Sequence, residues 1–200
     1  MQLLEREDEL RQLDRAVEDA RAARGGLVLV EGPPGIGKSR LLEAARARAR
    51  EAGMCVLSAR ASELDRDFPL GVVRQLFELL LADPDRAAGL LSGAARMAAP
   101  LLTAAAPEQK ADARADRSLA HFHSLYWLTA NLAEQGPVML SIDDAHWADA
   151  TSLRFLQFLV PRLEELPVLV ALGSRTAEPG IEREPIDALA IDPLARELAQ

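Results

Sequence analysis

The sequence is poor in cysteine, in long apolar runs and in positive charge. Its single cysteine, Cys55, excludes an internal disulfide and is typical of a protein from a reducing cytosol. The N-terminal stretch MQLLEREDEL is charged within five residues and contains no apolar signal-peptide core. No apolar run approaches the roughly 20 residues of a membrane-spanning helix. These absences predict a cytoplasmic protein without membrane contact.

The net charge is −8, so a broad nucleic-acid-binding surface is not expected, because neutralising phosphates requires a basic patch. The chain has 200 residues, 49% of them hydrophobic and 27% charged, which suits one globular domain with a core of its own. We therefore expect no nucleic-acid contact from this segment itself. A DNA-binding element elsewhere in a longer protein stays open.

Short apolar runs alternate with helical patterns along the chain. Continuous runs at 27–31, 54–59, 138–142 and 168–174 have the length and composition of strands buried on both faces of a sheet. A weaker fifth strand is expected at 189–191. This order predicts a mostly parallel α/β sheet covered by helices on both faces. Helical spacing of apolar residues predicts the helices at 3–24, 41–51, 70–82, 114–135 and 151–165.

A glycine-rich loop follows the first strand and leads into a helix. Residues 32–39, GPPGIGKS, satisfy the pattern G-x-x-x-x-G-K-S. Glycines allow the backbone to curl around phosphates, and successive N–H groups at a helix N-terminus form a concave anion site. Lys38 would place its charge on the β- and γ-phosphates of a nucleotide, and the Ser39 hydroxyl would bind Mg²⁺. The alternative is a strand-to-helix turn with a solvated lysine.

Pro33 and Pro34 divide this loop in two, because proline has no N–H to donate. They lie with Gly32 on the exit from the strand, where a fixed φ stiffens the backbone. The phosphate-binding donors are therefore expected from the second half of the loop. They are Gly35, Ile36, Gly37, Lys38, Ser39 and Arg40.

Two adjacent carboxylates follow the third predicted strand. Asp143 and Asp144, in LSIDDAHWAD, come at the carboxyl end of a buried strand, the edge at which ligands bind in open α/β sheets. Asp143 is the candidate second contact to Mg²⁺, together with Ser39 and waters, and Asp144 is the candidate to polarise an attacking water. Carboxylates this close favour a cation between them. The alternative is a solvated acidic turn that caps the next helix.

Several residues near these strand ends have weaker assignments. Trp147 is expected to pack beside the site, and His146 to be a turn residue. Asp149 is expected to cap the helix that begins near residue 151. Arg175 follows the strand at 168–174, and either it or Ser174 is a sensor of the γ-phosphate; the alternative is a surface arginine.

The chain resembles the ATPase module of the signal-transduction ATPases with numerous domains, a branch of the AAA+ ATPases. The resemblance rests on LLEREDELRQL, VEGPPGIGKSRLLE, DFPLGVVRQLFELLL, VMLSIDDAHWADATSLRFLQFL and LVALGSRT, in this order. The closest likeness is to large ATP-binding LuxR-type transcriptional regulators, and similar modules accompany nucleotide cyclases and protein kinases. The resemblance implies a P-loop NTPase three-layer sandwich over residues 1–192. Residues 193–200 would then be the start of a truncated helical lid.

The resemblance also implies roles for individual residues and ligands. Leu4, Glu5 and Arg6, at the start of the N-terminal helix, would line the adenine pocket, and Arg175 would be the first sensor. ATP or ADP and Mg²⁺ would be bound. ATP and a protein or small-molecule inducer would favour an active state, often a homo-oligomer, and ADP a closed one. The family's lid and helix-turn-helix would follow in a longer protein or be lacking in a short stand-alone relative.

The preferred hypothesis is a regulatory ATP switch with slow, Mg²⁺-dependent hydrolysis, in which Lys38, Asp144 and Arg175 act on the phosphates and the water. Asp144 is one methylene shorter than the glutamate common at this place in fast ATPases, so it would align the water less well. Three alternatives stay open: an ATPase module of a cyclase or kinase, a small-molecule phosphotransferase, and a non-catalytic nucleotide-binding interaction module.

Overall fold

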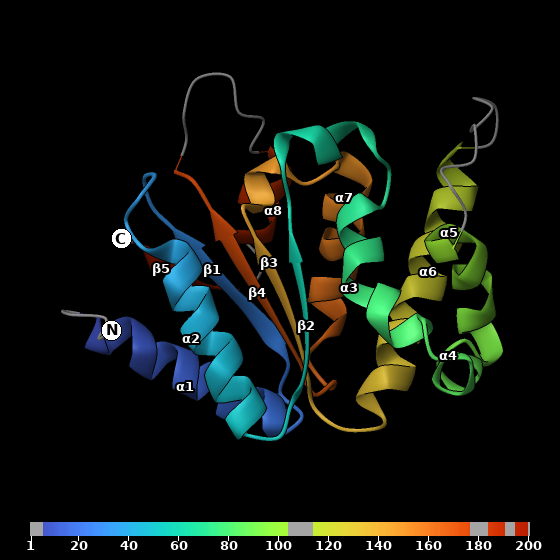
Figure 1. The fold of residues 1–200 in the computed structure, drawn as a ribbon, viewed down its shortest axis with the longest axis horizontal. Helices are drawn as coiled ribbons and strands as arrows, with labels where there is room; N and C mark the ends of the chain where they lie inside the picture. Colours follow the sequence, from blue (N-terminus) through green and yellow to red (C-terminus); the bar gives the residue numbers. More distant parts are fainter. Residues whose placement is uncertain (1–5, 104–113, 177–183, 191–194, 200) are drawn as a thin grey trace.

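The computed structural model describes residues 6–103, 114–176, 184–190 and 195–199 (Figure 1). Within them, five parallel strands form one sheet in the order β2-β3-β4-β1-β5. Because all strands run in one direction, their carboxyl ends meet at the same edge of the sheet. The strands are β1 (Gly26–Glu31), β2 (Cys55–Arg60), β3 (Val138–Asp143), β4 (Val168–Ser174) and β5 (Ala195–Ala199).

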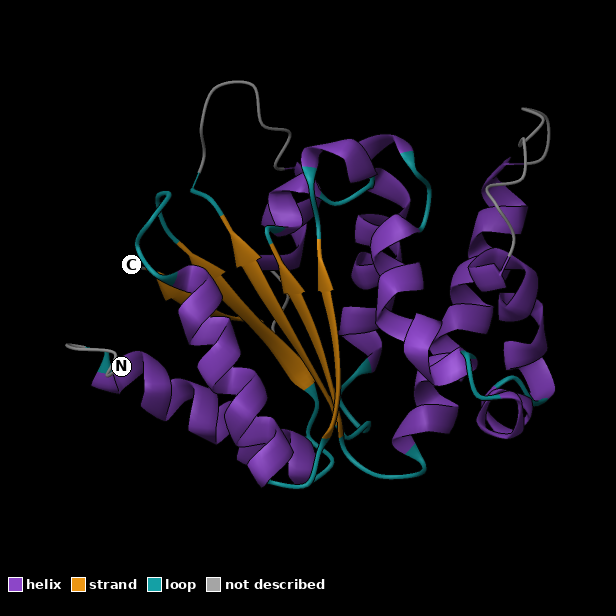
Figure 2. Cartoon of the chain, in the orientation of Figure 1, coloured by secondary structure: helices purple, strands orange, loops and turns teal. Residues whose placement is uncertain are grey.

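Helices cover both faces of this sheet (Figure 2). α1 and α2 lie on one face, and α3, α6, α7 and α8 lie on the other, beside α4 and α5. The predicted three-layer α/β sandwich is confirmed. The helices are α1 (Glu7–Arg21), α2 (Lys38–Glu51), α3 (Gly71–Leu81), α4 (Pro84–Leu90), α5 (Ala99–Thr103), α6 (Arg114–Ala133), α7 (Ala150–Leu159) and α8 (Glu184–Ala190), with short 3-10 turns at η1 (Glu63–Asp67), η2 (Gly93–Ala98), η4 (Ala145–Trp147) and η5 (Val160–Arg162).

Each face of the sheet has its own apolar core, which is why the strands are apolar on both sides. In β1, Leu27 and Leu29 belong to the core shared with α3 and α7, whereas Val28 and Val30 pack with α1 and α2. All four side chains are at most 1% exposed. Successive strand residues alternate between the two cores, so the strands occur in the sequence as continuous apolar runs.

The four strong strands begin and end within one residue of the ranges that the sequence predicts. The N-terminal helix, expected over 3–24, is α1 from Glu7 to Arg21, and Leu4 lies outside the described residues. Among the described helices, none combines the length and the apolar character that crossing a membrane requires.

The C-terminal strand lies further along the chain than predicted. A strand at 189–191 is wrong, because Leu189 belongs to α8. Residues 195–199, where the start of a helical lid was expected, are not helical, because Ala195–Ala199 form β5, which pairs in parallel with β1. The local sequence ARELA favours a helix by intrinsic propensity. The open edge of β1, however, presents unpaired N–H and C=O groups, and pairing with them overrides that propensity.

Candidate nucleotide site

The glycine-rich loop connects the end of β1 to the first turn of α2. Gly35 and Gly37 have φ angles of 81° and 104°, a left-handed conformation that L side chains rarely adopt. Gly37 is the N-cap residue of α2, so the N–H groups of the first helical turn follow it directly. The loop is closed by a hydrogen bond from the N–H of Ile36 to the Pro33 carbonyl, at 3.4 Å. The two glycines therefore make the tight turn that a phosphate-binding loop needs.

Lys38 is folded back against the first half of the loop. Its side chain is 7% exposed, and its Nζ donates to the carbonyl oxygens of Gly32 at 2.8 Å and Pro33 at 3.0 Å. The proline half of the loop thus supplies carbonyl acceptors for the ammonium group. The absence of N–H groups at the two prolines costs nothing in this role.

A cavity of about 550 Å³ lies over the loop and the neighbouring strand ends. Five cationic side chains line it against one carboxylate, in a chain of net charge −8, so the cavity suits a polyphosphate. Most of the sequence-predicted residues meet here, while Gly32 and Asp143 are not among the lining residues. The described lining residues are Arg6, Pro34, Gly35, Ile36, Gly37, Lys38, Ser39, Arg40, Arg60, Asp144 and Arg175.

Arg6 connects the start of α1 to the loop. Its Nη2 donates to the carbonyl oxygen of Ile36 at 2.6 Å, and its Nη1 lies 3.9 Å from the Glu9 carboxylate. The guanidinium also lies 4.0 Å from the place where a Cβ on Gly37 would stand. Arg6 therefore contacts both the loop backbone and the cavity.

Asp143 is the last residue of β3 and lies beside Gly173 of β4, which has no side chain. Its side chain is 6% exposed, and its Oδ1 accepts the N–H of Asp144 at 3.0 Å. A Cβ on Gly173 would lie 3.1 Å from this oxygen and 2.8 Å from Cδ1 of Leu42. The carboxylate thus occupies space that only glycine leaves open. With the exposed hydroxyl of Ser39 it offers hard oxygen donors, the kind that Mg²⁺ prefers, so the residues fit that ion.

Replacing Gly173 by alanine is expected to lower Mg²⁺-dependent nucleotide affinity about tenfold, because the new methyl group displaces the Asp143 carboxylate or Leu42. Titrating ATP at several Mg²⁺ concentrations measures the effect. Gly89→Ala is the matched control, since nothing lies within 4 Å of its Cβ position. Equal ATP and Mg²⁺ affinities in the two variants would contradict the packing argument.

Asp144 is held by Arg60, a residue that the sequence analysis did not identify. Nε and Nη2 of Arg60 both donate to Oδ2 of Asp144 at 3.2 Å. Asp144 has a φ of 53°, which turns the chain sharply after β3. Arg60 ends β2 and is paired in register with Asp143. The argument from strand ends that identified Asp143 would therefore also have found Arg60.

His146 is buried, whereas the sequence predicted a turn residue without further role. It is 2% exposed, and neither ring nitrogen has a hydrogen-bond partner among the described residues. Burial lowers its pKa from 6.5 to about 4; the Asp144 charge opposes this, while Arg175, Lys38 and Arg66 lower the pKa further. The imidazole is therefore neutral near pH 7.

This low pKa predicts a pH-dependent stability. Between about pH 4 and pH 6.5 the unfolded chain binds a proton at His146 that the folded chain does not, so stability is lost as the pH falls through this window. From pH 7 to pH 5 we expect His146 to remove about 2 kcal/mol of unfolding free energy. Urea unfolding at both pH values, with His146→Phe as the comparison, measures it. The same pH dependence in both proteins would be the contrary result.

The predicted cap at Asp149 is confirmed, and it does more than cap. The side chain is 1% exposed, and its Oδ1 accepts the N–H of Ser152 at 2.8 Å, which caps α7. The same oxygen accepts the N–H of Leu70 at 2.8 Å, and Oδ2 accepts the Ser152 hydroxyl at 2.6 Å. Asp149 therefore joins the start of α7 to the start of α3.

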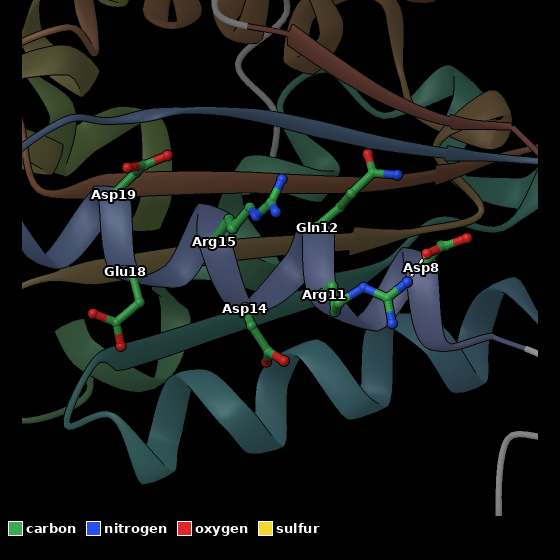
Figure 3. Close-up of a pocket in the computed structure, with 7 residues that line it drawn as sticks. All are labelled: Asp8, Arg11, Gln12, Asp14, Arg15, Glu18 and Asp19. Carbon is green, nitrogen blue, oxygen red and sulfur yellow. Dashed lines mark hydrogen bonds and ion pairs between the residues drawn. The ribbon is translucent and has the colours of Figure 1, made fainter.

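A second and larger hollow, of about 890 Å³, lies on the charged face of α1 (Figure 3). Each of its four carboxylates is paired with an arginine: Asp8 with Arg11, Asp14 with Arg48 at 2.5 Å, Glu18 with Arg21 at 3.4 Å, and Asp19 with Arg24 at 2.7 Å. It has neither a glycine-rich turn nor a buried polar side chain among its described lining residues, so we assign it no chemistry. Those residues are Asp8, Arg11, Gln12, Asp14, Arg15, Glu18 and Asp19.

Comparison with known proteins gives the same picture of the fold. Residues 2–171 match the AAA ATPase domain family. The uncharacterized protein R02095 of Rhizobium meliloti (strain 1021) is 29% identical over 226 residues, covering 96% of this chain and 20% of the relative. This chain therefore spans about a fifth of the length of that curated relative. A structure of Drosophila ORC bound to DNA is similar in fold, with a TM-score of 0.52, 18% identity, and coverage of 99% of this chain and 44% of that one.

Proposed function

This chain belongs to the AAA ATPase domain family, and from that premise we propose that it is a slow, Mg²⁺-dependent ATP switch of a LuxR-type transcriptional regulator. Family membership indicates nucleotide binding and hydrolysis. Slow hydrolysis is inferred from the contact between Arg60 and Asp144, which restrains the carboxylate that would act on water. The regulator context rests on the resemblance of DFPLGVVRQLFE and the neighbouring motifs.

ATP binding would use the second half of the loop and the cationic wall of the cavity. The N–H groups that follow Gly37 at the start of α2 would bind phosphate oxygens. The Lys38 ammonium would move from the carbonyls of Gly32 and Pro33 onto the β- and γ-phosphates. Arg6 would contact the nucleotide from the side of α1, and Arg175 would approach the γ-phosphate from β4.

Ser39 and Asp143 would hold Mg²⁺, which when bound neutralises charge on the β- and γ-phosphate oxygens. The rest of the chemistry belongs to the side chains of the chain. Asp144 would accept a hydrogen bond from the attacking water and orient it towards the γ-phosphorus. While both Arg60 nitrogens bind its Oδ2, this carboxylate is a poorer acceptor and is turned towards β2. Hydrolysis would be faster with the ion pair open, because the Asp144 carboxylate would then be a stronger acceptor.

Arg60→Ala is therefore expected to speed single-turnover hydrolysis about two- to fivefold. The gain is limited because Arg60 is 74% exposed, and pairs of this kind contribute at most about 1 kcal/mol. The rate should be measured at saturating ATP, since Arg60 also lines the cavity. Asp144→Asn should abolish hydrolysis, with or without Arg60. Slower hydrolysis by the Arg60→Ala variant would contradict the proposed restraint of Asp144 by Arg60.

Calorimetric titration with ATP and ADP, followed by an assay for free phosphate, tests the proposed activity. The switch predicts binding of both nucleotides in Mg²⁺ and slow release of phosphate into water. Transfer of the phosphate to a small acceptor would favour a phosphotransferase instead, and binding without hydrolysis would favour a non-catalytic module. A helix-turn-helix encoded downstream in the same reading frame would support the regulator over a cyclase- or kinase-linked ATPase.

A further inference from the structure

Trp147 has two arginines from different elements near its indole ring. Cζ of Arg66, on η1, is 4.5 Å from the centroid of the indole ring, and Cζ of Arg175, which follows β4, is 6.0 Å from it. Both distances are within the roughly 6 Å over which an aromatic ring attracts a cation. Tryptophan has the strongest such attraction among the aromatic side chains. The ring can therefore attract both cations, of which Arg175 lines the cavity.

The position of this ring is fixed to the turn that carries Asp144. Trp147 ends η4, and its backbone N–H donates to the Asp144 carbonyl at 2.8 Å. The preceding residue, His146, is buried, with its ring 5.1 Å from the indole. Arg66 completes the arrangement by donating from Nη2 to the His146 carbonyl at 3.4 Å. The backbone of Trp147 is therefore tied to the turn of the residue that would orient the water.

We infer that Trp147 is a positioning residue for Arg175. This inference rests on the proposed ATP switch and concerns how that switch distinguishes ATP from ADP. A free arginine loses much rotamer freedom when it binds a phosphate. An indole ring that already holds the guanidinium at the cavity wall reduces that loss. The benefit applies to ATP, whose γ-phosphate Arg175 would reach, and not to ADP, which has none.

Arg66 brings a second positive charge to the same ring. It is half-buried, and it lies closer to the ring than Arg175 does. Its charge repels the Arg175 guanidinium, and a γ-phosphate placed near Arg175 would relieve that repulsion. The pKa of His146 is lowered by both arginines, as expected for charges that surround the same turn. A γ-phosphate at Arg175 would add the opposite charge to this pair of arginines.

The test compares ATP and ADP affinities, measured by calorimetry in Mg²⁺, for Trp147→Leu and Trp147→Phe. Trp147→Leu is expected to reduce the preference for ATP over ADP about threefold or more, with the ADP affinity unchanged within about twofold. Trp147→Phe should restore most of the preference, since a ring remains. Arg175→Gln, which removes the phosphate contact itself, should lose at least as much of the preference, and the double variant should be no worse than Arg175→Gln alone. Trp127→Leu is the matched control, because Trp127 lies on α6, outside the cavity lining.

A second readout uses the tryptophan itself. In a Trp127→Phe background, Trp147 is the one remaining tryptophan in the sequence. Its emission should change on adding ATP with Mg²⁺ but not ADP, and the change should disappear in Arg175→Gln. An equal loss of ATP and ADP affinity in Trp147→Leu would show a merely structural role and overturn the inference. An unchanged preference would overturn it too. Failure of the wild type to bind either nucleotide would instead overturn the proposed function, and the inference with it.

Discussion

Replacing Lys38 by alanine is expected to weaken ATP binding at least about 100-fold. The ammonium would form charge-assisted contacts with two phosphates, each worth about 1.5–3 kcal/mol, and alanine can form neither. Lys38 is buried and bonded to the carbonyls of Gly32 and Pro33. The other cation of the loop, Arg40, is exposed and would not take its place. Calorimetric titration with ATP and Mg²⁺ measures the loss, and circular dichroism checks that the fold is retained.

Pro33→Ala and Pro34→Ala are the controls within the same loop. Both prolines lack an N–H, so alanine removes no phosphate contact, and the Pro33 carbonyl that accepts from Lys38 stays in place. We expect ATP affinity to change less than about threefold, and stability to fall by about 0.4–1 kcal/mol through the less restricted unfolded chain. Proline variants as damaging as Lys38→Ala would contradict the division of the loop into two halves.

Asp149→Ala is expected to lower the free energy of unfolding by about 3–4 kcal/mol. The variant loses the cap of α7 and leaves the buried N–H groups of Leu70 and Ser152 without their acceptor. It also removes the partner of the Ser152 hydroxyl. Urea unfolding gives the difference from the midpoint and slope.

Two variants bracket this value. Asp149→Asn keeps one oxygen for the two N–H groups, so a smaller loss of about 1–2 kcal/mol is expected. Asp14→Ala removes a surface carboxylate that is 51% exposed and paired with Arg48, and should cost at most about 1 kcal/mol. If Asp149→Ala cost no more than Asp14→Ala, the link between α7 and α3 would not be important for stability.

Much of the fold could be read from the sequence because it depends on local patterns. Strands buried on both faces are recognisable as apolar runs, and the glycine-rich loop by its spacing. Asp143 followed from its place at the end of such a run. For the same reason Asp149 was identifiable as a cap, since only its own helix start decides that role. These features need no knowledge of which distant residues meet.

The features that the sequence did not reveal depend on distant contacts. β5 has the composition of a helix and becomes a strand beside β1. His146 has the spacing of a turn residue, and its burial depends on the elements packed around η4. The contacts of Arg66 and Arg175 with one indole ring join a residue of η1 to the residue that follows β4. Arg60 was also missed, although its position at the end of β2 could have identified it from the sequence.

Single-turnover hydrolysis of ATP in Mg²⁺, with free phosphate as the product measured, tests the central claim most directly. A switch in which Arg60 restrains Asp144 predicts complete conversion to ADP and phosphate, with a rate constant well below about 1 s⁻¹. A rate constant of about 10 s⁻¹ or more, the usual range of enzymes built for turnover, would contradict it. Absence of any hydrolysis by the wild-type protein would contradict it as well.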